Sequence, residues 1–175
     1  SRSTSKDYGF VSVRSILQDS RGDIWLGSND EGLQKVSENG NKLYTIENGL
    51  PNNSVRALCE DADGNIWIGT ASGVVYLTPD EKLINPQFGA GTTASGVIAS
   101  NLFCDSSERV WLTTSNENGL FQCVEGVFKP LEEFEKYTTY FATSIFEDRE
   151  NKIWVGLGEK GIAVFADGKV EILKT

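Results

Sequence analysis

One phrase recurs four times along the chain at nearly equal spacing, and this repetition limits the possible folds more than any other feature. The phrase combines an acidic turn, an aliphatic residue followed by tryptophan, and a later glycine. The only tryptophans of the chain mark the four copies and lie 42, 44 and 43 residues apart: Trp25, Trp67, Trp111 and Trp154. A period in the forties is typical of propeller blades and of helical repeat arrays.

Each copy also keeps an aspartate six residues before its tryptophan, and a glycine six to eight residues after it. The aspartates are Asp19, Asp61, Asp105 and Asp148. Because these landmarks stay in register through all four copies, they indicate tandem repeats rather than chance.

The composition of a copy distinguishes strands from helices. In the second copy, residues 54–61, 65–70, 73–78 and 82–88 are short runs separated by turn-forming residues. Runs of this length, rich in β-branched and aromatic side chains, predict strands. No window keeps the apolar period of an amphipathic helix, although residues 131–136 come nearest. Four strands make one antiparallel sheet, and sheets repeated around an axis make a β-propeller. We therefore predict an all-β fold, a β-propeller of four blades.

The predicted organisation is a flexible leader followed by four blades, the last with its own final strand. The leader is 1–12 and the blades are about 13–53, 54–96, 97–139 and 140–175. Four blades of this length form a portion of a larger propeller, a closed four-bladed ring, or an arc completed by another chain. An open arc leaves apolar faces on its end blades. We therefore expect the chain either to self-associate through its end blades or to close.

The aspartate–tryptophan pair is interpreted as structural. The aspartate carboxylate can accept hydrogen bonds from backbone N–H groups two residues on. The tryptophan ring can fill the space between neighbouring sheets, with its N–H directed to a partner. Gly22, Gly64 and Asn151 tolerate positive φ in the turn, whereas Glu108 adopts it only at a cost. The third copy is thus predicted to use a different turn.

This pattern resembles the two-component regulator propeller repeat. The best copy is SVRALCEDADGNIWIGTASGVVYL at residues 54–77, introduced by NGLPNN at 48–53, and the resemblance covers 13–175. Copy three departs most, with Thr113 where the repeat has glycine. The resemblance implies an extracytoplasmic (periplasmic) sensor region of a bacterial hybrid histidine kinase or diguanylate cyclase, within a larger membrane-anchored protein. Such propellers bind an external ligand, often an oligosaccharide, without changing it.

Charge and hydropathy restrict the partners. The net charge of −9, from 16 basic and 25 acidic residues, disfavours nucleic acid and anionic membrane surfaces. No apolar run approaches the roughly 20 residues needed to cross a bilayer. We expect no nucleic-acid partner and no membrane contact by this segment.

The chain contains no histidine, so the Ser-His-Asp and Cys-His constellations are absent. This counts against the streptogramin-lyase propellers, which share the strand pattern and are understood to use histidine. Sialidases also place Asp, Gly and Trp in turns, but Asp61 lies three residues before Gly64 rather than two. A sialidase-like glycoside-processing propeller is therefore the less favoured alternative. We predict no catalytic residue and no cofactor.

Metal and thiol chemistry also receive little support. Asp61, Asp63 and Asn65 offer oxygen atoms for calcium, but no bidentate carboxylate follows them, so a bare turn is predicted. The three cysteines, Cys59, Cys104 and Cys123, lack metal-binding spacing. We expect buried free thiols, with a Cys104–Cys123 disulfide as the alternative.

Ligand binding is predicted on the face opposite the aspartate turns. In a four-stranded meander, the loops between strands two and three emerge there together with the connections between blades. These loops are rich in Asn, Ser, Thr and Glu, which suit a neutral hydroxylated ligand or a protein surface. The candidates are Asn29, Asp30, Glu31, Asn52, Asn53, Ser72, Asn116, Glu117, Asn118, Glu159 and Lys160. Two alternatives stay open: the loops are merely polar, or the chain is a structural or dimerisation module for protein docking.

Overall fold

The computed structural model describes residues 12–89, 97–115, 119–131, 142–166 and 168–173. Within them, the strands form four successive sheets, each a blade whose neighbouring strands are antiparallel except for one parallel pair in blade three. The predicted all-β propeller architecture is thus confirmed. Residues 1–11 of the predicted leader, and residues 132–136 of the segment whose sequence comes nearest to a helical period, lie outside the described residues.

The four blades follow the chain order. Blade one contains β1 (Val13–Gln18), β2 (Ile24–Ser28), β3 (Leu33–Ser37) and β4 (Gly40–Tyr44). Blade two contains β5 (Val55–Glu60), β6 (Ile66–Thr70), β7 (Gly73–Leu77) and β8 (Leu83–Ile84). Blade three contains β10 (Ala99–Cys104), β11 (Val110–Thr114), β12 (Leu120–Val124), β13 (Val127–Pro130) and an added strand, β9 (Gln87–Phe88). Blade four contains β14 (Ser144–Glu147), β15 (Ile153–Gly156), β16 (Ile162–Ala166) and β17 (Lys169–Leu173). Two 3₁₀ turns, η1 (Ile46–Asn48) and η2 (Gly158–Lys160), lie in the loops.

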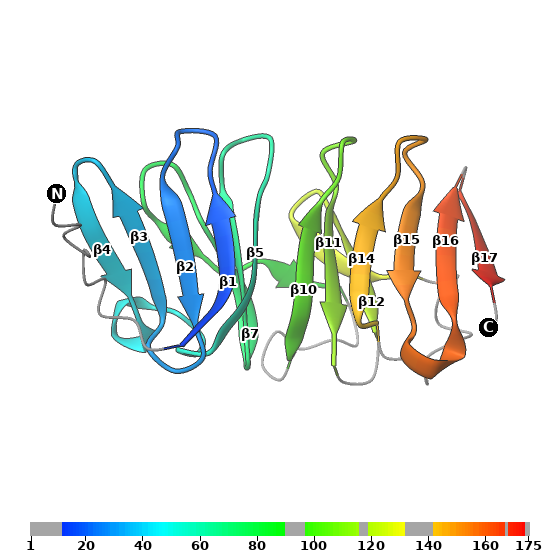
Figure 1. Ribbon diagram of the computed structural model, residues 1–175, viewed down its shortest axis with the longest axis horizontal. Helices are drawn as coiled ribbons and strands as arrows, with labels where there is room; N and C mark the ends of the chain where they lie inside the picture. Colours follow the sequence, from blue (N-terminus) through cyan, green and yellow to red (C-terminus); the bar gives the residue numbers. More distant parts are fainter. Residues whose placement is uncertain (1–11, 90–96, 116–118, 132–141, 167, 174–175) are drawn as a thin grey trace, which may run out of the picture.

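The blades stand side by side in an open arc, with blades one and four at opposite ends of the long axis (Figure 1). The first strands of successive blades pack against one another: β1 on β5, β5 on β10, and β10 on β14. This open arrangement fits either a portion of a larger propeller or an arc completed by another chain, and it is not a closed four-bladed ring.

The strand β9 departs from the predicted blade division. Residues 82–88 were expected to form one strand of blade two, but the ladder of β8 ends at Ile84. Pro86 follows closely and has no backbone N–H to continue a ladder. Beyond it, β9 pairs in parallel with β13 of blade three, and Phe88 stacks on Phe128 with ring centroids 5.2 Å apart. The end of the second copy therefore ties blade two to blade three.

The core consists of three apolar clusters, one at each junction between blades. Trp25, Trp67 and Trp111 are 1%, 4% and 2% exposed, and each belongs to a cluster shared with the following blade. Trp67, for example, meets Phe128 of blade three edge to face at 5.5 Å. Trp154 is only half-buried, because no described blade follows it. The prediction of tryptophans buried between sheets thus holds fully for three of the four.

The turn of the third copy corrects a prediction. Glu108 adopts φ of 64°, close to the 76° of Gly64 and the 60° of Asn151, and its N–H donates to the carbonyl of Asp105 at 3.0 Å. All four copies therefore share one turn. The Asp105 carboxylate accepts N–H bonds from the residues on both sides of Glu108, which holds it in a left-handed conformation that costs about 1–2 kcal/mol.

The cysteines correct a second prediction. Cys59 on β5 and Cys104 on β10 form a disulfide between blades two and three, with Cα atoms 6.0 Å apart. Cys123 is a free, half-buried thiol, so the expectation of free thiols is wrong for Cys59 and Cys104, and the alternative Cys104–Cys123 pair is not found. The reason is geometric. Equivalent positions on the first strands of successive blades become neighbours, because those strands pack against each other.

Candidate functional site

The aspartate–tryptophan pairs form a repeated hydrogen-bond unit at one edge of the blades. In the second copy, Oδ1 of Asp61 accepts the backbone N–H groups of Asp63 at 3.1 Å and Asn65 at 2.9 Å. Its Oδ2 accepts the indole N–H of Trp67 at 2.7 Å. The other three tryptophans donate to their aspartates at 2.7–2.9 Å. The predicted bonds from backbone N–H groups are present. The partner of each indole N–H is the aspartate six residues before the tryptophan, and this constant spacing is the sequence signal for the pair.

These bonds lower the pKa of two of the aspartates, Asp19 and Asp148. For Asp19, burial opposes ionisation, but hydrogen bonds from the Trp25 indole and from backbone N–H groups, together with the charge of Arg21, lower the pKa below its ordinary value. The Trp154 indole is the main cause of the lowered pKa of Asp148. Carboxylates whose oxygens are already occupied by protein donors stabilise the turns and are poorly suited to acid–base chemistry.

The fourth residue after each aspartate adds a variable contact. Asn65 donates its side-chain amide to Asp61 at 3.0 Å, and Arg109 donates Nε to Asp105 at 2.6 Å. In the turn whose oxygen atoms were considered as calcium ligands, Asn65 therefore donates a hydrogen bond to Asp61. In the part of the chain that the structure describes, no group of three or more His, Cys, Asp or Glu side chains is placed to hold a metal ion.

The described parts of the predicted loops emerge at the edge of the arc opposite the aspartate turns, as the meander geometry requires (Figure 1). Around the connection between blades one and two they form a continuous surface. The Gly32 N–H donates to the Asn53 carbonyl at 2.9 Å, and the Ser72 hydroxyl donates to the Pro51 carbonyl at 3.1 Å. We call the residues 28–32, 45–54 and 70–73 the loop surface.

Several candidates on the loop surface hold its shape. The side-chain oxygen of Asn52 accepts the Ser54 N–H at 2.8 Å, and that of Asn53 accepts the Ile46 N–H at 2.9 Å. Asn29 donates its amide to Ser12 at 2.6 Å. The backbone N–H groups of Asp30 and Glu31 donate to the Ser28 hydroxyl.

The remaining candidates are not part of this surface. Glu159 and Lys160 lie in η2, on blade four at the far end of the arc. Asn116, Glu117 and Asn118 lie outside the described residues.

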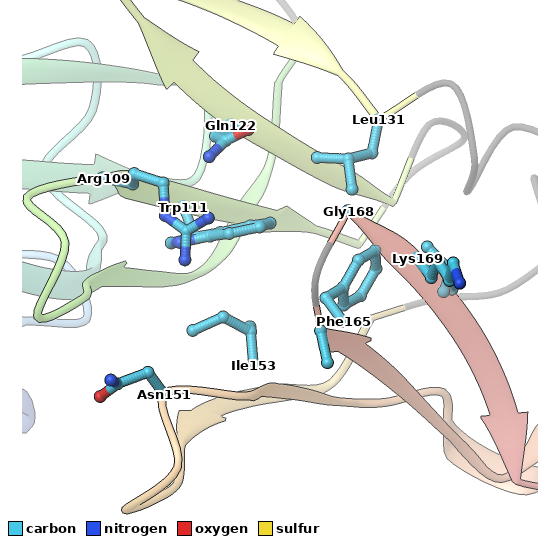
Figure 2. Close-up of a pocket in the computed structure, with 11 residues that line it drawn as sticks. Arg109, Trp111, Gln122, Leu131, Asn151, Ile153, Phe165, Gly168 and Lys169 are labelled. Atoms are coloured by element: carbon cyan, nitrogen blue, oxygen red, sulfur yellow. The ribbon is translucent and has the colours of Figure 1, made fainter.

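Two cavities on the aspartate-turn edge were not predicted. Each lies at a junction between blades, beneath the turns that join strands one to two and three to four. The cavity between blades two and three measures about 270 Å³ and that between blades three and four about 250 Å³. The latter is shown in Figure 2, where Arg109 lies over Trp111 and Phe165 faces them from blade four. Neither cavity is lined by a predicted loop candidate.

A third cavity, of about 400 Å³, lies between blades one and two, and a lysine in its wall is paired with carboxylates from both blades. Nζ of Lys35 lies 2.9 Å from Asp23 and 3.6 Å from Glu81, and 5.3 Å from the centre of the Trp25 ring. The three junctions therefore share an architecture but differ in the side chains that fill it.

A family model described as the two component regulator propeller matches residues 7–30 and 49–72. The resemblance deduced from the repeats is thereby confirmed over these two segments. No curated protein matches the chain significantly.

Solved structures share the fold. The extracellular domain of a hybrid two component system from B. thetaiotaomicron is 21% identical, with a TM-score of 0.73 over 93% of this chain and 25% of its own. A second such domain from B. thetaiotaomicron is 25% identical, with a TM-score of 0.68 over 87% and 21%. Virginiamycin B lyase from Staphylococcus aureus is 17% identical, with a TM-score of 0.71 over 91% and 54%. The chain thus spans about half of the lyase and about a quarter of the extracellular domain.

Proposed function

We propose that this chain is part of a ligand-sensing propeller in a bacterial signalling protein, either a two-component sensor or a diguanylate cyclase. The observation that carries the proposal is the match of two copies to the two-component regulator propeller repeat. The fold shared with extracellular domains of hybrid two component systems supports the same context.

The proposed location is outside the cytoplasm, in the periplasm, as part of a larger membrane-anchored protein. The Cys59–Cys104 disulfide supports it, because disulfides persist in oxidising compartments and are rare in the cytosol. None of the helices within the described ranges has the length and apolar character to span a bilayer.

The proposed action is binding without chemical change. The chain has no histidine, the commonest general base near neutral pH. Its repeated carboxylates are occupied by indole and backbone donors. The similarity to virginiamycin B lyase is one of fold, because the two sequences are only 17% identical.

The loop surface is the proposed contact for a neutral hydroxylated ligand such as an oligosaccharide. Asn52 and Asn53 use their side-chain oxygens to hold the loop, which leaves their Nδ2 groups without a bond to any described residue. Because an internal hydrogen bond already fixes these side chains, they can donate to sugar hydroxyls with little further loss of conformational entropy.

An oligosaccharide screen against the immobilised chain, followed by calorimetry on each hit, tests the proposal. Asn52→Asp and Asn53→Asp keep the structural oxygen and remove the Nδ2 donors, so we expect each to weaken binding about tenfold. Asn39→Asp adds the same charge at an exposed turn on the opposite edge and should leave binding unchanged. Absence of any hit, or equal affinity in all variants, would contradict the proposal.

A second candidate function is docking through the end blades. Ile16 is 69% exposed and Phe146 63% exposed, on the outward faces of blades one and four. Their counterparts in the second copy are packed at junctions between blades. Leu58, the counterpart of Ile16, contacts the apolar cluster of Trp25, and Cys59, the counterpart of Phe146, belongs to the cluster of Trp67. The two end faces are thus the two halves of one junction, which favours head-to-tail association with another blade.

A further inference from the structure

The cavity between blades three and four combines positive charge with aromatic walls. The Arg109 guanidinium lies 5.2 Å from the centre of the Trp111 ring, and Phe165 approaches that ring at 5.8 Å. Figure 2 shows Arg109 at one end of the cavity and Lys169 at the other, with Phe165 between them and Leu131 at the rim.

Neither cation is fully neutralised by the described residues. The Nε of Arg109 donates a hydrogen bond to Asp105, but the terminal nitrogens make no hydrogen bond to any described residue. The side chain is 40% exposed. Lys169 is exposed and forms no ion pair within the described ranges. No described carboxylate lines the cavity. Its described lining therefore carries two positive charges, one of them balanced by the buried Asp105.

The same space at the preceding junction has the opposite charge. Trp67 and Trp111 occupy equivalent places, but the second junction is lined by Asp61, Asp63, Glu108 and Glu125 and by no described Lys or Arg. The first junction also has a cavity, of about 400 Å³, but there Lys35 and Lys42 are paired with Asp23 and Glu81. Counted over the described residues, the third junction alone offers an anion an open space with an excess of positive charge.

We propose that this third junction binds a small carboxylate attached to a single ring. The terminal nitrogens of Arg109 bind the carboxylate, and stacking on Trp111 fixes the plane of the guanidinium. The ring lies against Phe165 and Leu131, whose apolar surfaces suit an aromatic ring or the apolar face of a sugar. A volume of about 250 Å³ lies just below the range of about 300–1,000 Å³ for drug-sized ligands, which limits the occupant to about one ring.

Glu108, Glu125 and the loop surface take no part in this site. It lies at the edge opposite the loop surface, so it does not depend on the proposed function.

Titration followed through the four indole N–H signals in a ¹H–¹⁵N spectrum tests the site. Benzoate carries the carboxylate on an aromatic ring, and glucuronate carries it on a sugar ring. Their relative affinities show which kind of ring the site prefers. We expect at least one of them to shift the Trp111 signal saturably and to leave the Trp67 signal unchanged. Benzylamine carries the opposite charge and should leave Trp111 unchanged.

Two variants test the cations with the fold preserved. Arg109→Asn copies the second blade, where Asn65 makes the equivalent bond to Asp61. It should therefore keep the turn and weaken carboxylate binding at least about tenfold, whereas Lys169→Gln should weaken it about threefold. Lys82→Gln removes one charge at a distant exposed turn and should match the unaltered chain. The proposal is overturned if neither carboxylate shifts Trp111, if all four indoles shift alike, or if Arg109→Asn binds as tightly as the unaltered chain.

Discussion

Replacing equivalent tryptophans should have unequal effects, because each tryptophan packs on the next blade. Trp67 is 4% exposed and contacts Tyr76 at 4.7 Å and Phe128 at 5.5 Å. Burial of an indole removes about 150–250 Å² from water, and at about 25 cal/mol per Å² this contributes about 4–6 kcal/mol. Trp67→Ala should therefore lower the free energy of unfolding by about 3–5 kcal/mol, the usual range for large core truncations.

Trp154→Ala is the matched comparison. It removes the same side chain and the same indole–aspartate bond, but Trp154 is half-buried with no described blade beyond it, so we expect a loss of about 1–3 kcal/mol. Urea unfolding followed by far-ultraviolet circular dichroism measures both. Trp67→Phe, with an expected loss of about 1–2 kcal/mol, keeps the comparison measurable if the alanine variant does not fold. A loss below about 1 kcal/mol for Trp67→Ala, or equal losses at both sites, would refute the packing argument.

Three further predictions concern strain, pH and assembly. Glu108→Gly should raise the free energy of unfolding by about 0.5–1 kcal/mol by relieving positive φ, whereas Glu108→Ala should not; a stabilisation by both would show that the side chain matters instead. The pKa of Asp19 is lowered below 3.8 in the folded chain, so its contribution to stability is present above about pH 4 and is lost as the pH falls through the lowered value. Asp19→Asn should therefore make the urea midpoint of unfolding less dependent on pH between about pH 4 and 2. The same pH dependence in the variant and the unaltered chain would contradict this. The chain should self-associate in concentration-dependent light scattering, and Ile16→Glu combined with Phe146→Glu should yield monomers; an unaltered chain that stays monomeric at high concentration would refute docking through the end faces.

The blade architecture could be predicted because it follows from local signals. The spacing of the tryptophans sets the blade length, and the alternating apolar runs bounded by turn formers set the strands. The backbone bonds of Asp61 follow equally from its place in a turn. Each of these features depends on residues close together in the sequence.

The missed features depend on contacts between blades or on competing local forces. The Cys59–Cys104 disulfide requires that the first strands of successive blades touch. The transfer of β9 to blade three depends on a ladder partner, β13, some forty residues away. Glu108 shows a local conflict, in which two bonds to the Asp105 carboxylate outweigh the cost of positive φ.

The candidate site was predictable only in part, for the same reason. The loop surface follows from the order of strands in a meander, and the structure brings Asn53 and Ser72 to one connection. The charged cavities require side chains from two blades to face each other, so Arg109 and Lys169 gave no combined signal in the sequence.

The central claim, binding without chemical change, is tested most directly by recovering a bound ligand. An oligosaccharide that binds the loop surface is incubated with a stoichiometric amount of the chain, released by unfolding, and measured by mass spectrometry beside a sample with Asn52→Asp. We predict complete recovery of the unchanged oligosaccharide from both samples, with less of it retained before unfolding by the Asn52→Asp chain. Loss of the oligosaccharide with the appearance of a cleaved or eliminated product, absent from the variant, would contradict the claim.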